Sequence, residues 1–193
     1  MCKFILASAS PRRREILNNI GMEFEVLVSM ADESKIDRNL EPEMLVLELS
    51  MLKATDVAAS LKGDYFVIGA DTVVSLDGKI LEKPIDEEDA RRMLENLSGK
   101  THSVYTGVCI YSTKTGKAVS KFQKTDVKFK KLSRRKIEAY IESKEPMDKA
   151  GSYGIQGKGA LLIDEIKGDY FNVVGLPISL LADMFFDEFG IEI

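Results

Sequence analysis

The chain has 193 residues, 45% of them hydrophobic and 30% charged, with a formal net charge of −4. This composition is that of a folded globular protein and excludes a disordered or fibrous chain, so we expect one domain over residues 1–193. The acidic balance argues against a nucleic-acid polymer as partner, because a polyanion would have to be held by a local cationic site.

Compartment and membrane association can also be judged from composition. Cys2 and Cys109 show no metal-ligand spacing, and Cys109 lies in an apolar, strand-like run, which fits a reducing cytoplasm. The apolar run near the N-terminus is too short for a signal peptide, and its positive charges follow it. No stretch approaches eighteen apolar residues, so we expect a cytoplasmic protein with no membrane span.

Hydrophobic periodicity and turn residues predict the elements of the chain. In order they are a strand over 3–8, a helix from Pro11 that Ser10 caps and Gly21 ends, a strand over 24–28, a helix over 42–61, a hairpin over 65–84 that turns at Asp77 and Gly78, a helix from Asp86 to Leu97, strands over 101–112 and 117–132, a helix capped by Ser133, a glycine-rich loop over 151–159, a strand near 160–166 and a helix from Pro177. Helices that alternate with hairpins and single strands indicate a mixed sheet covered by helices.

The stretch "FILASASPRRREIL" places polar and cationic residues where an apolar strand meets a helix. A helix N-terminus that follows a strand presents backbone N–H groups that bind anions. Ser8 and Ser10 add hydroxyl groups, and Arg12 and Arg13 add guanidinium groups that can hold phosphate oxygens. The alternative is that Ser10 is only a cap and the arginines form a solvated face.

Asp71 interrupts the apolar run "FVIGADTVV", on the strand face that carries Val67 and Val73. Aspartate is depleted in strands, and a buried carboxylate is costly unless it is paired, hydrogen-bonded or bound to a metal. The alternative is that Asp71 marks a strand end or a bulge beside Gly69. Because local rules fail most often at functional sites, we interpret Asp71 as a functional residue.

Three further charged residues draw attention by their positions. Lys53 interrupts the apolar stripe of the helix over 42–61, Lys83 follows the hairpin that carries Asp71, and Glu33 lies in a polar loop. Taken singly, each has an ordinary structural explanation, such as a lysine that extends along apolar surface to keep its charge in water.

Several chemistries are excluded by residue type. The segment "GSYGIQGKG" is not a nucleotide-binding Walker loop, because Ser152 and Gly159 occupy positions where that motif needs glycine and Ser or Thr. The single histidine, His102, permits no histidine-based metal site and makes acyl transfer improbable. Serines, cations and isolated carboxylates remain, and these are the groups of a metal-assisted phosphate site.

The segments that carry these residues resemble those of the Maf family, nucleoside triphosphate pyrophosphatases also described as septum-formation inhibitors. The resemblance covers nearly the whole chain and is carried, in order, by "LASASPRRREIL", "ADES", "LKA", "GADTVV", "LEKP", "LSGKTHSVYTGV", "EPMDKAGSYGIQGKGALLI" and "VVGLP". It implies an elongated α/β fold with a central mixed sheet flanked by helices, and two lobes around a deep nucleotide-binding cleft.

The resemblance also implies roles for single residues. Asp71 would be the catalytic base and, with Glu33, would bind a divalent cation, Mg²⁺ or Mn²⁺. The phosphates would be held by Ser8, Arg12, Arg13, Lys53 and Lys83, with Ser10 also in contact with the substrate. Hydrolysis between the α and β phosphates would release a nucleoside monophosphate and pyrophosphate, and a homodimer would be common in the family.

Three residues, Arg12, Thr72 and Gln156, are similar to the branch of the family that acts on dTTP and UTP. The Gln156 amide offers one donor and one acceptor, which suits the imide edge of uracil or thymine. Two alternatives stay open: a pyrophosphatase for 7-methyl-GTP or other modified nucleotides, and a non-catalytic nucleotide-binding regulator of septum formation.

Overall fold

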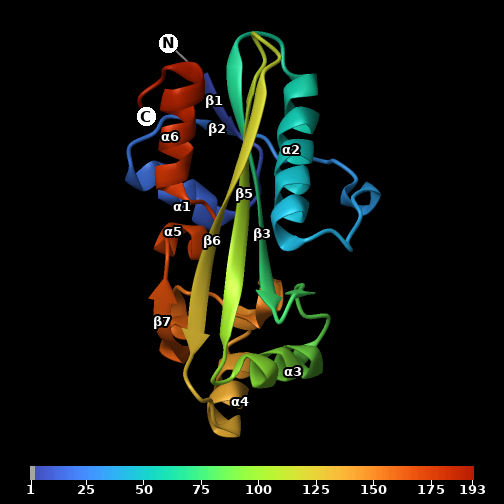
Figure 1. The fold of residues 1–193 in the computed structure, drawn as a ribbon, viewed down its shortest axis with the longest axis vertical. Helices are drawn as coiled ribbons and strands as arrows, with labels where there is room; N and C mark the ends of the chain where they lie inside the picture. The colour runs from blue at the N-terminus through green and yellow to red at the C-terminus, as the bar shows by residue number, and fades with distance from the viewer. Residues whose placement is uncertain (1–2) are drawn as a thin grey trace. The chain divides into compact units, whose positions relative to one another are not determined.

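A seven-stranded mixed sheet flanked by helices forms the fold in the computed structural model, which describes residues 3–193 (Figure 1). The strand order is β2-β1-β3-β5-β6-β7, with β4 paired to β3. The elements are β1 Lys3–Leu6, α1 Pro11–Asn19, β2 Glu25–Val26, η1 Glu33–Lys35, α2 Pro42–Ser60, β3 Tyr65–Leu76, β4 Lys79–Leu81, α3 Glu87–Leu97, β5 Thr101–Ser112, β6 Ala118–Phe129, α4 Arg134–Glu142, η2 Glu145–Asp148, η3 Ala150–Ser152, η4 Gly157–Leu162, β7 Ile163–Lys167, α5 Tyr170–Val174 and α6 Ile178–Phe189, where η marks a 3₁₀ helix. The predicted α/β class is confirmed.

The chain divides into two compact units. Unit 1 comprises the chain up to Asp71 together with Thr106–Gln123 and Gly175–Ile193, and unit 2 comprises Thr72–Tyr105 and Lys124–Val174. The single domain predicted over residues 1–193 stays a prediction. Cys2 lies outside the described residues. Within residues 3–193, no helix is both long and apolar enough to cross a membrane.

In unit 1, β1 runs parallel to both β2 and β3. Helix α2 lies against the strands at two glycines: a Cβ on Gly69 would lie 2.2 Å from the Ser50 carbonyl oxygen, and one on Gly107 would lie 2.2 Å from that of Val46. At such distances a side chain at either position would force α2 away from the strands. The two glycines therefore allow the backbone of α2 to pack directly on the sheet.

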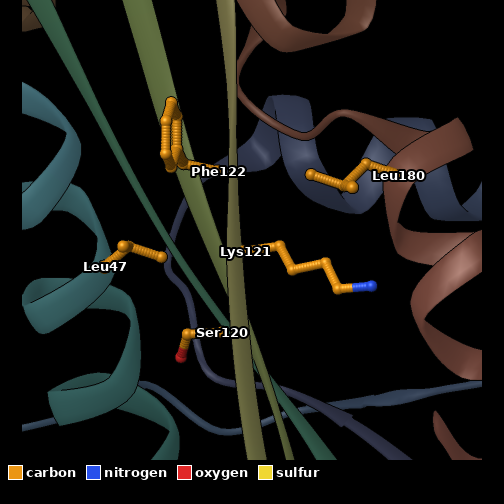
Figure 2. Close-up of a pocket in the computed structure, with 5 residues that line it drawn as sticks. All are labelled: Leu47, Ser120, Lys121, Phe122 and Leu180. Atoms are coloured by element: carbon orange, nitrogen blue, oxygen red, sulfur yellow. The ribbon is translucent and has the colours of Figure 1, made fainter.

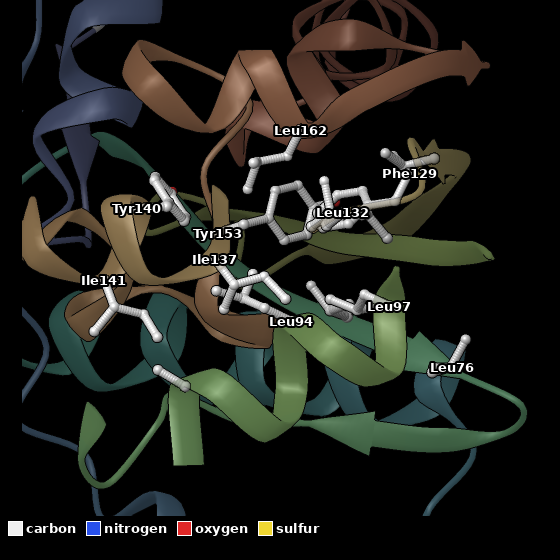
Figure 3. Packing of buried hydrophobic residues seen from close by; sticks show 14 residues of the cluster. Leu76, Leu94, Leu97, Phe129, Leu132, Ile137, Tyr140, Ile141, Tyr153 and Leu162 are labelled. Atoms are coloured by element: carbon white, nitrogen blue, oxygen red, sulfur yellow. The ribbon is translucent and has the colours of Figure 1, made fainter. Parts of the chain in front are cut away.

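In unit 2, a buried apolar cluster joins α3, α4 and the strands that they cover (Figure 3). Phe129 and Tyr153 pack edge to face in this cluster, with ring centroids 4.7 Å apart. The hairpin between β3 and β4 turns at Asp77 and Gly78, whose φ angles of 51° and 78° are both positive, as the sequence pattern Asp-Gly predicts for a two-residue turn.

Most predicted helices begin where their capping residues lie. The side chains of Asp86 and Ser133 accept hydrogen bonds from Asp89 N and Lys136 N, as predicted. Ser10 precedes α1 as predicted but makes no capping hydrogen bond through its side chain. Pro at the first helical position already removes one unpaired N–H group, so α1 begins without that bond.

Several predicted boundaries were wrong, and the α-helix α5 and the short 3₁₀ helices were not predicted. The first strand ends at Leu6 and not at Ser8, and the second is two residues long, since β1 pairs with it only at Ile5 and Leu6. The segment 157–162 forms a 3₁₀ helix, and the strand predicted near 160–166 starts at Ile163.

Candidate active site

Lys53 joins two of the predicted site carboxylates within unit 1. Its Nζ lies 2.5 Å from Asp71 Oδ1 and 3.1 Å from Glu33 Oε1. The side chains of Lys53 and Asp71 are only 16% and 15% exposed, whereas that of Glu33 is 40% exposed. Three charged residues that lie far apart in the sequence therefore form one cluster, in which an ammonium bridges two carboxylates.

The close approach of α2 to β3 places the ammonium beside Asp71. A Cβ on Gly69 would meet the backbone of α2 at Ser50 and Ala54, and Asp71 follows two residues later on the same strand face. Lys53 lies in the same part of the helix. The apolar surroundings of Lys53 in the sequence thus result from its packing against the sheet, where its charge meets a carboxylate.

Glu33 is placed by hydrogen bonds around a short polar turn. The Asp32 side chain accepts from the backbone N of Ser34 at 3.1 Å and caps η1, where Glu33 begins the helix. Asp56, on α2, accepts from Ser29 Oγ at 2.8 Å and from the backbone N of Met30 at 2.9 Å. The helix that carries Lys53 therefore also fixes the segment that leads to Glu33.

Arg13 is buried at the start of α1 and binds three parts of unit 1. Its Nε donates to the Gly175 carbonyl oxygen at 2.7 Å, and its Nη1 donates to Ser8 Oγ at 3.0 Å and to the Ala70 carbonyl oxygen at 2.9 Å. Burial lowers the pKa of Arg13, while Asp71 raises it and the neighbouring Arg12 lowers it. The phosphate contact predicted for Arg13 stays a prediction, and the structure adds a contact to the residue before Asp71.

The other residues of the strand-to-helix joint lie close to Arg13. Ser8 is buried, and its Oγ accepts from the backbone N of Ser10 at 3.3 Å in addition to Arg13. Arg12 and Ser10 are partly exposed. The structure therefore brings Ser8, Arg13, Glu33, Lys53 and Asp71 into contact with one another in unit 1, directly or through the backbone at Ala70, with Ser10 and Arg12 beside them.

Thr72, Lys83 and Gln156 belong to unit 2. Lys83 is exposed in the segment after β4, and Gln156 is partly exposed at the start of η4, where its side chain makes no capping hydrogen bond. The backbone N of Gly151 donates to the Glu82 carbonyl oxygen at 3.0 Å. This bond ties the glycine-rich loop that leads to Gln156 to the segment that carries Lys83.

The residues present fit a divalent cation only in part. Within residues 3–193, no three His, Cys, Asp or Glu residues are grouped so as to hold a metal ion. The carboxylates of Glu33 and Asp71, however, face the same ammonium. Magnesium is commonly bound by one or two carboxylates together with substrate phosphates, so this pair fits a cation that arrives with a nucleotide.

An open hollow of about 380 Å³ lies elsewhere in unit 1, lined by Leu47, Ser120, Lys121, Phe122 and Leu180 (Figure 2). None of the predicted site residues lines it. Its walls carry one charged side chain and no carboxylate, so it offers no set of groups for phosphate chemistry.

Sequence reasoning missed the residues that hold the site in place. Gly175 and Ala70 act through carbonyl oxygens, which leave no mark in a sequence. Asp56 looks like an ordinary polar position of a helix, and Glu145 lies in a charged stretch that looks solvated. Gly69 did carry a signal, because an isolated glycine within a strand indicates a close approach of another backbone.

Comparison with known proteins identifies the family of the chain. The family model described as Maf-like protein matches residues 3–188. A dTTP/UTP pyrophosphatase of Thermoanaerobacter sp. (strain X514) is 50% identical over 191 residues, 99% of each chain, and one of Alkaliphilus oremlandii (strain OhILAs) is 50% identical over 193 residues, 100% of each. Among solved structures, the Staphylococcus aureus Ham1 protein matches with a TM-score of 0.47 and 12% identity, over 66% of this chain and 71% of that one. The match over residues 3–188 and the two full-length relatives show that the chain belongs to the Maf-like protein family.

Proposed function

We propose that the protein hydrolyses dTTP and UTP, and related noncanonical pyrimidine nucleotides, to a nucleoside monophosphate and pyrophosphate. One observation supports it most directly: Lys53, Glu33 and Asp71 form a cluster beside the joint that carries Ser8 and Arg13, in a chain 50% identical to proteins named dTTP/UTP pyrophosphatase. These groups match the needs of a triphosphate: cations and hydroxyls for its oxygens, and a carboxylate to accept a proton.

Asp71 is the general base in this proposal. A water oxygen attacks the α-phosphorus while a proton of that water passes to the Asp71 carboxylate. The bond between the α-phosphorus and the oxygen that bridges to the β-phosphate breaks, and its electron pair leaves with pyrophosphate. The strand position of Asp71 is held on one side by Lys53 and on the other by the bond from Arg13 to Ala70.

The cations and hydroxyls bind the triphosphate. We assign the phosphate oxygens to Arg12, Arg13, Lys53 and Lys83, together with the hydroxyls of Ser8 and Ser10. Preorganised positive charge stabilises the negative charge that develops on the leaving pyrophosphate. Lys53 has a second task, because its ammonium compensates Glu33 and Asp71 in this structure.

A divalent cation, Mg²⁺ or Mn²⁺, completes the proposed site. Oxygens of Glu33 and Asp71 would hold it together with the substrate phosphates, and when bound it would neutralise phosphate charge and polarise the attacking water.

Gln156 and Thr72 are the proposed determinants of the base. The Gln156 amide donates one hydrogen bond and accepts one, which matches the imide edge of uracil and thymine. A substrate of this kind is a free nucleotide, so we propose neither a nucleic-acid polymer nor a membrane as partner. We also propose that the protein acts in the cytoplasm and forms a homodimer.

A nucleotide panel with pyrophosphate detection tests it. The wild-type protein is assayed with dTTP, UTP, ATP, GTP and 7-methyl-GTP, with and without Mg²⁺ or Mn²⁺. We expect pyrophosphate only when metal is present, and only from dTTP and UTP. The preference for these two nucleotides follows because an unmatched base leaves buried polar groups unpaired, at a cost of about 1–3 kcal/mol each. Equal turnover of 7-methyl-GTP would reassign the base, and release of no pyrophosphate from any nucleotide would favour a regulator.

A further inference from the structure

The glycine-rich loop around Gln156 is wrapped about one carboxylate, that of Glu145. Glu145 Oε2 accepts from the backbone N of Lys158 at 3.0 Å, and Oε1 accepts from the backbone N of Gly159 at 3.1 Å. Two successive N–H groups that meet one anion form a small anion-binding nest. Here a side chain of the same unit fills it, from 13 and 14 residues away in the sequence.

Tyr140 extends this network to the other side of Gln156. Its hydroxyl donates to Glu145 Oε1 at 3.0 Å and accepts from the backbone N of Gly154 at 3.1 Å. Burial, and to a smaller extent the Glu145 carboxylate, raise the pKa of Tyr140, so the hydroxyl keeps its proton at neutral pH and donates it to the carboxylate. Gln156 therefore lies between two points of the backbone that the Glu145–Tyr140 pair holds.

The glycines of the loop are explained by this packing. A Cβ on Gly159 would lie 2.0 Å from the Gly154 carbonyl oxygen and 2.8 Å from the Tyr140 hydroxyl. Gly157 has a φ of +65°, and a Cβ there would lie 3.0 Å from Glu145 Oε2. A side chain at either position would push the loop off the carboxylate. The glycines of the segment "GSYGIQGKG" thus allow the loop to bind an internal anion.

Glu145 itself is fixed from its backbone side. Lys149 Nζ donates to the Glu145 carbonyl oxygen at 2.6 Å, and Pro146 follows at the start of η2. At the near end of the loop, the Tyr153 hydroxyl lies 2.6 Å from His102 Nε2 within the buried cluster of unit 2. The backbone that carries the Glu145 carboxylate is thus fixed by Lys149. The start of the loop is fixed by the contact of Tyr153 in the core.

We propose that Glu145 is a positioning residue for Gln156: its carboxylate holds the loop over residues 154–159 in the conformation that presents the Gln156 amide to a pyrimidine base. The inference rests on the proposed function, because it assigns Glu145 an effect on base selectivity. Glu145 contacts no reacting atom and acts through the loop alone.

The test compares Glu145→Gln with the wild type and with Glu142→Gln, a matched control at an exposed position of the same unit. The amide that replaces the Glu145 carboxylate can accept only through its one oxygen, so at least one of the two backbone N–H groups loses its partner. Amide exchange at Lys158 and Gly159 is measured first. Binding of non-hydrolysable α,β-methylene analogues of UTP and GTP with Mg²⁺ is then measured by calorimetry.

We expect faster exchange at one or both of these amides in Glu145→Gln, and a UTP-analogue Kd raised about tenfold while the GTP-analogue Kd changes little. In a Gln156→Ala background, Glu145→Gln should change the ratio of the two Kd values no further, since the effect passes through Gln156. Unchanged exchange, or faster exchange with an unchanged Kd ratio, overturns the inference.

Tyr140→Phe provides a second variant if Glu145→Gln does not fold. It retains the carboxylate and removes only the hydroxyl that binds Gly154, so we expect the same direction of change with a smaller size. Pyrophosphate release by the wild type is a separate readout. Its absence would refute the proposed function, whereas the analogue Kd ratio would still decide the role of Glu145.

Discussion

Asp71 combines a position that is rare for its residue type with a charged partner. A carboxylate in a largely buried strand is stabilised here by the Lys53 ammonium at 2.5 Å, and the Arg13 guanidinium holds the neighbouring carbonyl of Ala70. These contacts fix the position of the Asp71 carboxylate, and its second oxygen can still accept a hydrogen bond or a proton. These contacts support the proposed role of Asp71 as the general base.

Asp71→Asn should abolish most hydrolysis and preserve the fold. The amide keeps the shape of the side chain but cannot act as a base, and loss of a general base lowers the rate by about 10² to 10⁴. Pyrophosphate release and thermal unfolding are measured on the variant and on Asp64→Asn, an exposed control in unit 1. Near-normal turnover by folded Asp71→Asn would remove Asp71 from the mechanism.

Arg12 and Arg13 should differ in their effect on stability although they are neighbours. Arg13→Ala leaves the Gly175 and Ala70 carbonyl oxygens without their donor and should lower the free energy of unfolding by about 2–4 kcal/mol. Arg12→Ala removes a charge that repels Arg13, so its effect should stay within about 0.5 kcal/mol. Urea unfolding without nucleotide measures both. Equal losses would contradict the structural role of Arg13.

At the scale of elements, the contact between α2 and β3 decides the geometry of the site. Gly69 lets the helix backbone touch the strand, and the same helix carries Lys53 toward Asp71 and Asp56 toward the segment before Glu33. One helix thereby positions two carboxylates that lie on different segments. A small displacement of α2 should therefore disturb both at once.

Gly69→Ala tests this dependence. The added methyl group would lie 2.2 Å from the Ser50 carbonyl oxygen, so α2 must move outward, at a cost of about 1–3 kcal/mol in stability. Misplacement of Lys53 should lower kcat/KM at least about tenfold. Thermal unfolding and pyrophosphate release measure the two effects.

Gly78→Ala is the control for Gly69→Ala. Its methyl group would meet nothing within 4 Å, so only the strain of its positive φ should appear, about 1 kcal/mol with activity retained. If Gly69→Ala were as active and stable as Gly78→Ala, direct packing of α2 on β3 would not matter for the site.

At the scale of the whole molecule, His102 should dominate one part of the pH dependence of stability. Burial lowers the pKa of this single histidine to about 4, from an ordinary value of 6.5. The unfolded chain therefore binds the proton more readily than the folded one between these two pH values. The contribution of the neutral His102 ring to the free energy of unfolding is fully present above about pH 6.5. It is lost progressively as the pH falls toward 4, by up to about 3 kcal/mol.

Two measurements check the titration of His102. Because the chain has one histidine, its ring resonance in an NMR titration needs no assignment, and it should show no protonation above about pH 5. In His102→Gln, the difference in unfolding free energy between pH 7 and pH 4.5 should shrink, since the remaining difference comes from carboxylates alone. An ordinary histidine titration near pH 6.5 would contradict the burial of the ring.

The sequence by itself determined the fold class, the family and most of the helices, because these depend on local residue patterns that can be read along the chain. Periodicity placed α2 within one residue of its end, Asp-Gly fixed the hairpin turn, and side-chain caps marked α3 and α4. Asp71, Lys53 and Glu33 are also marked in the sequence, since their charges lie within or beside segments whose patterns do not require them.

Tertiary structure alone decided how these residues meet. The decisive contacts join distant segments of the chain. Lys53 bridges Glu33 and Asp71, and Arg13 binds the carbonyls of Ala70 and Gly175. Glu145 accepts hydrogen bonds from the loop around Gln156. Backbone carbonyl and amide groups supply many of these contacts, and every residue type except proline offers the same ones. A sequence therefore shows which charges must find partners, whereas only packing in three dimensions shows which partners they find.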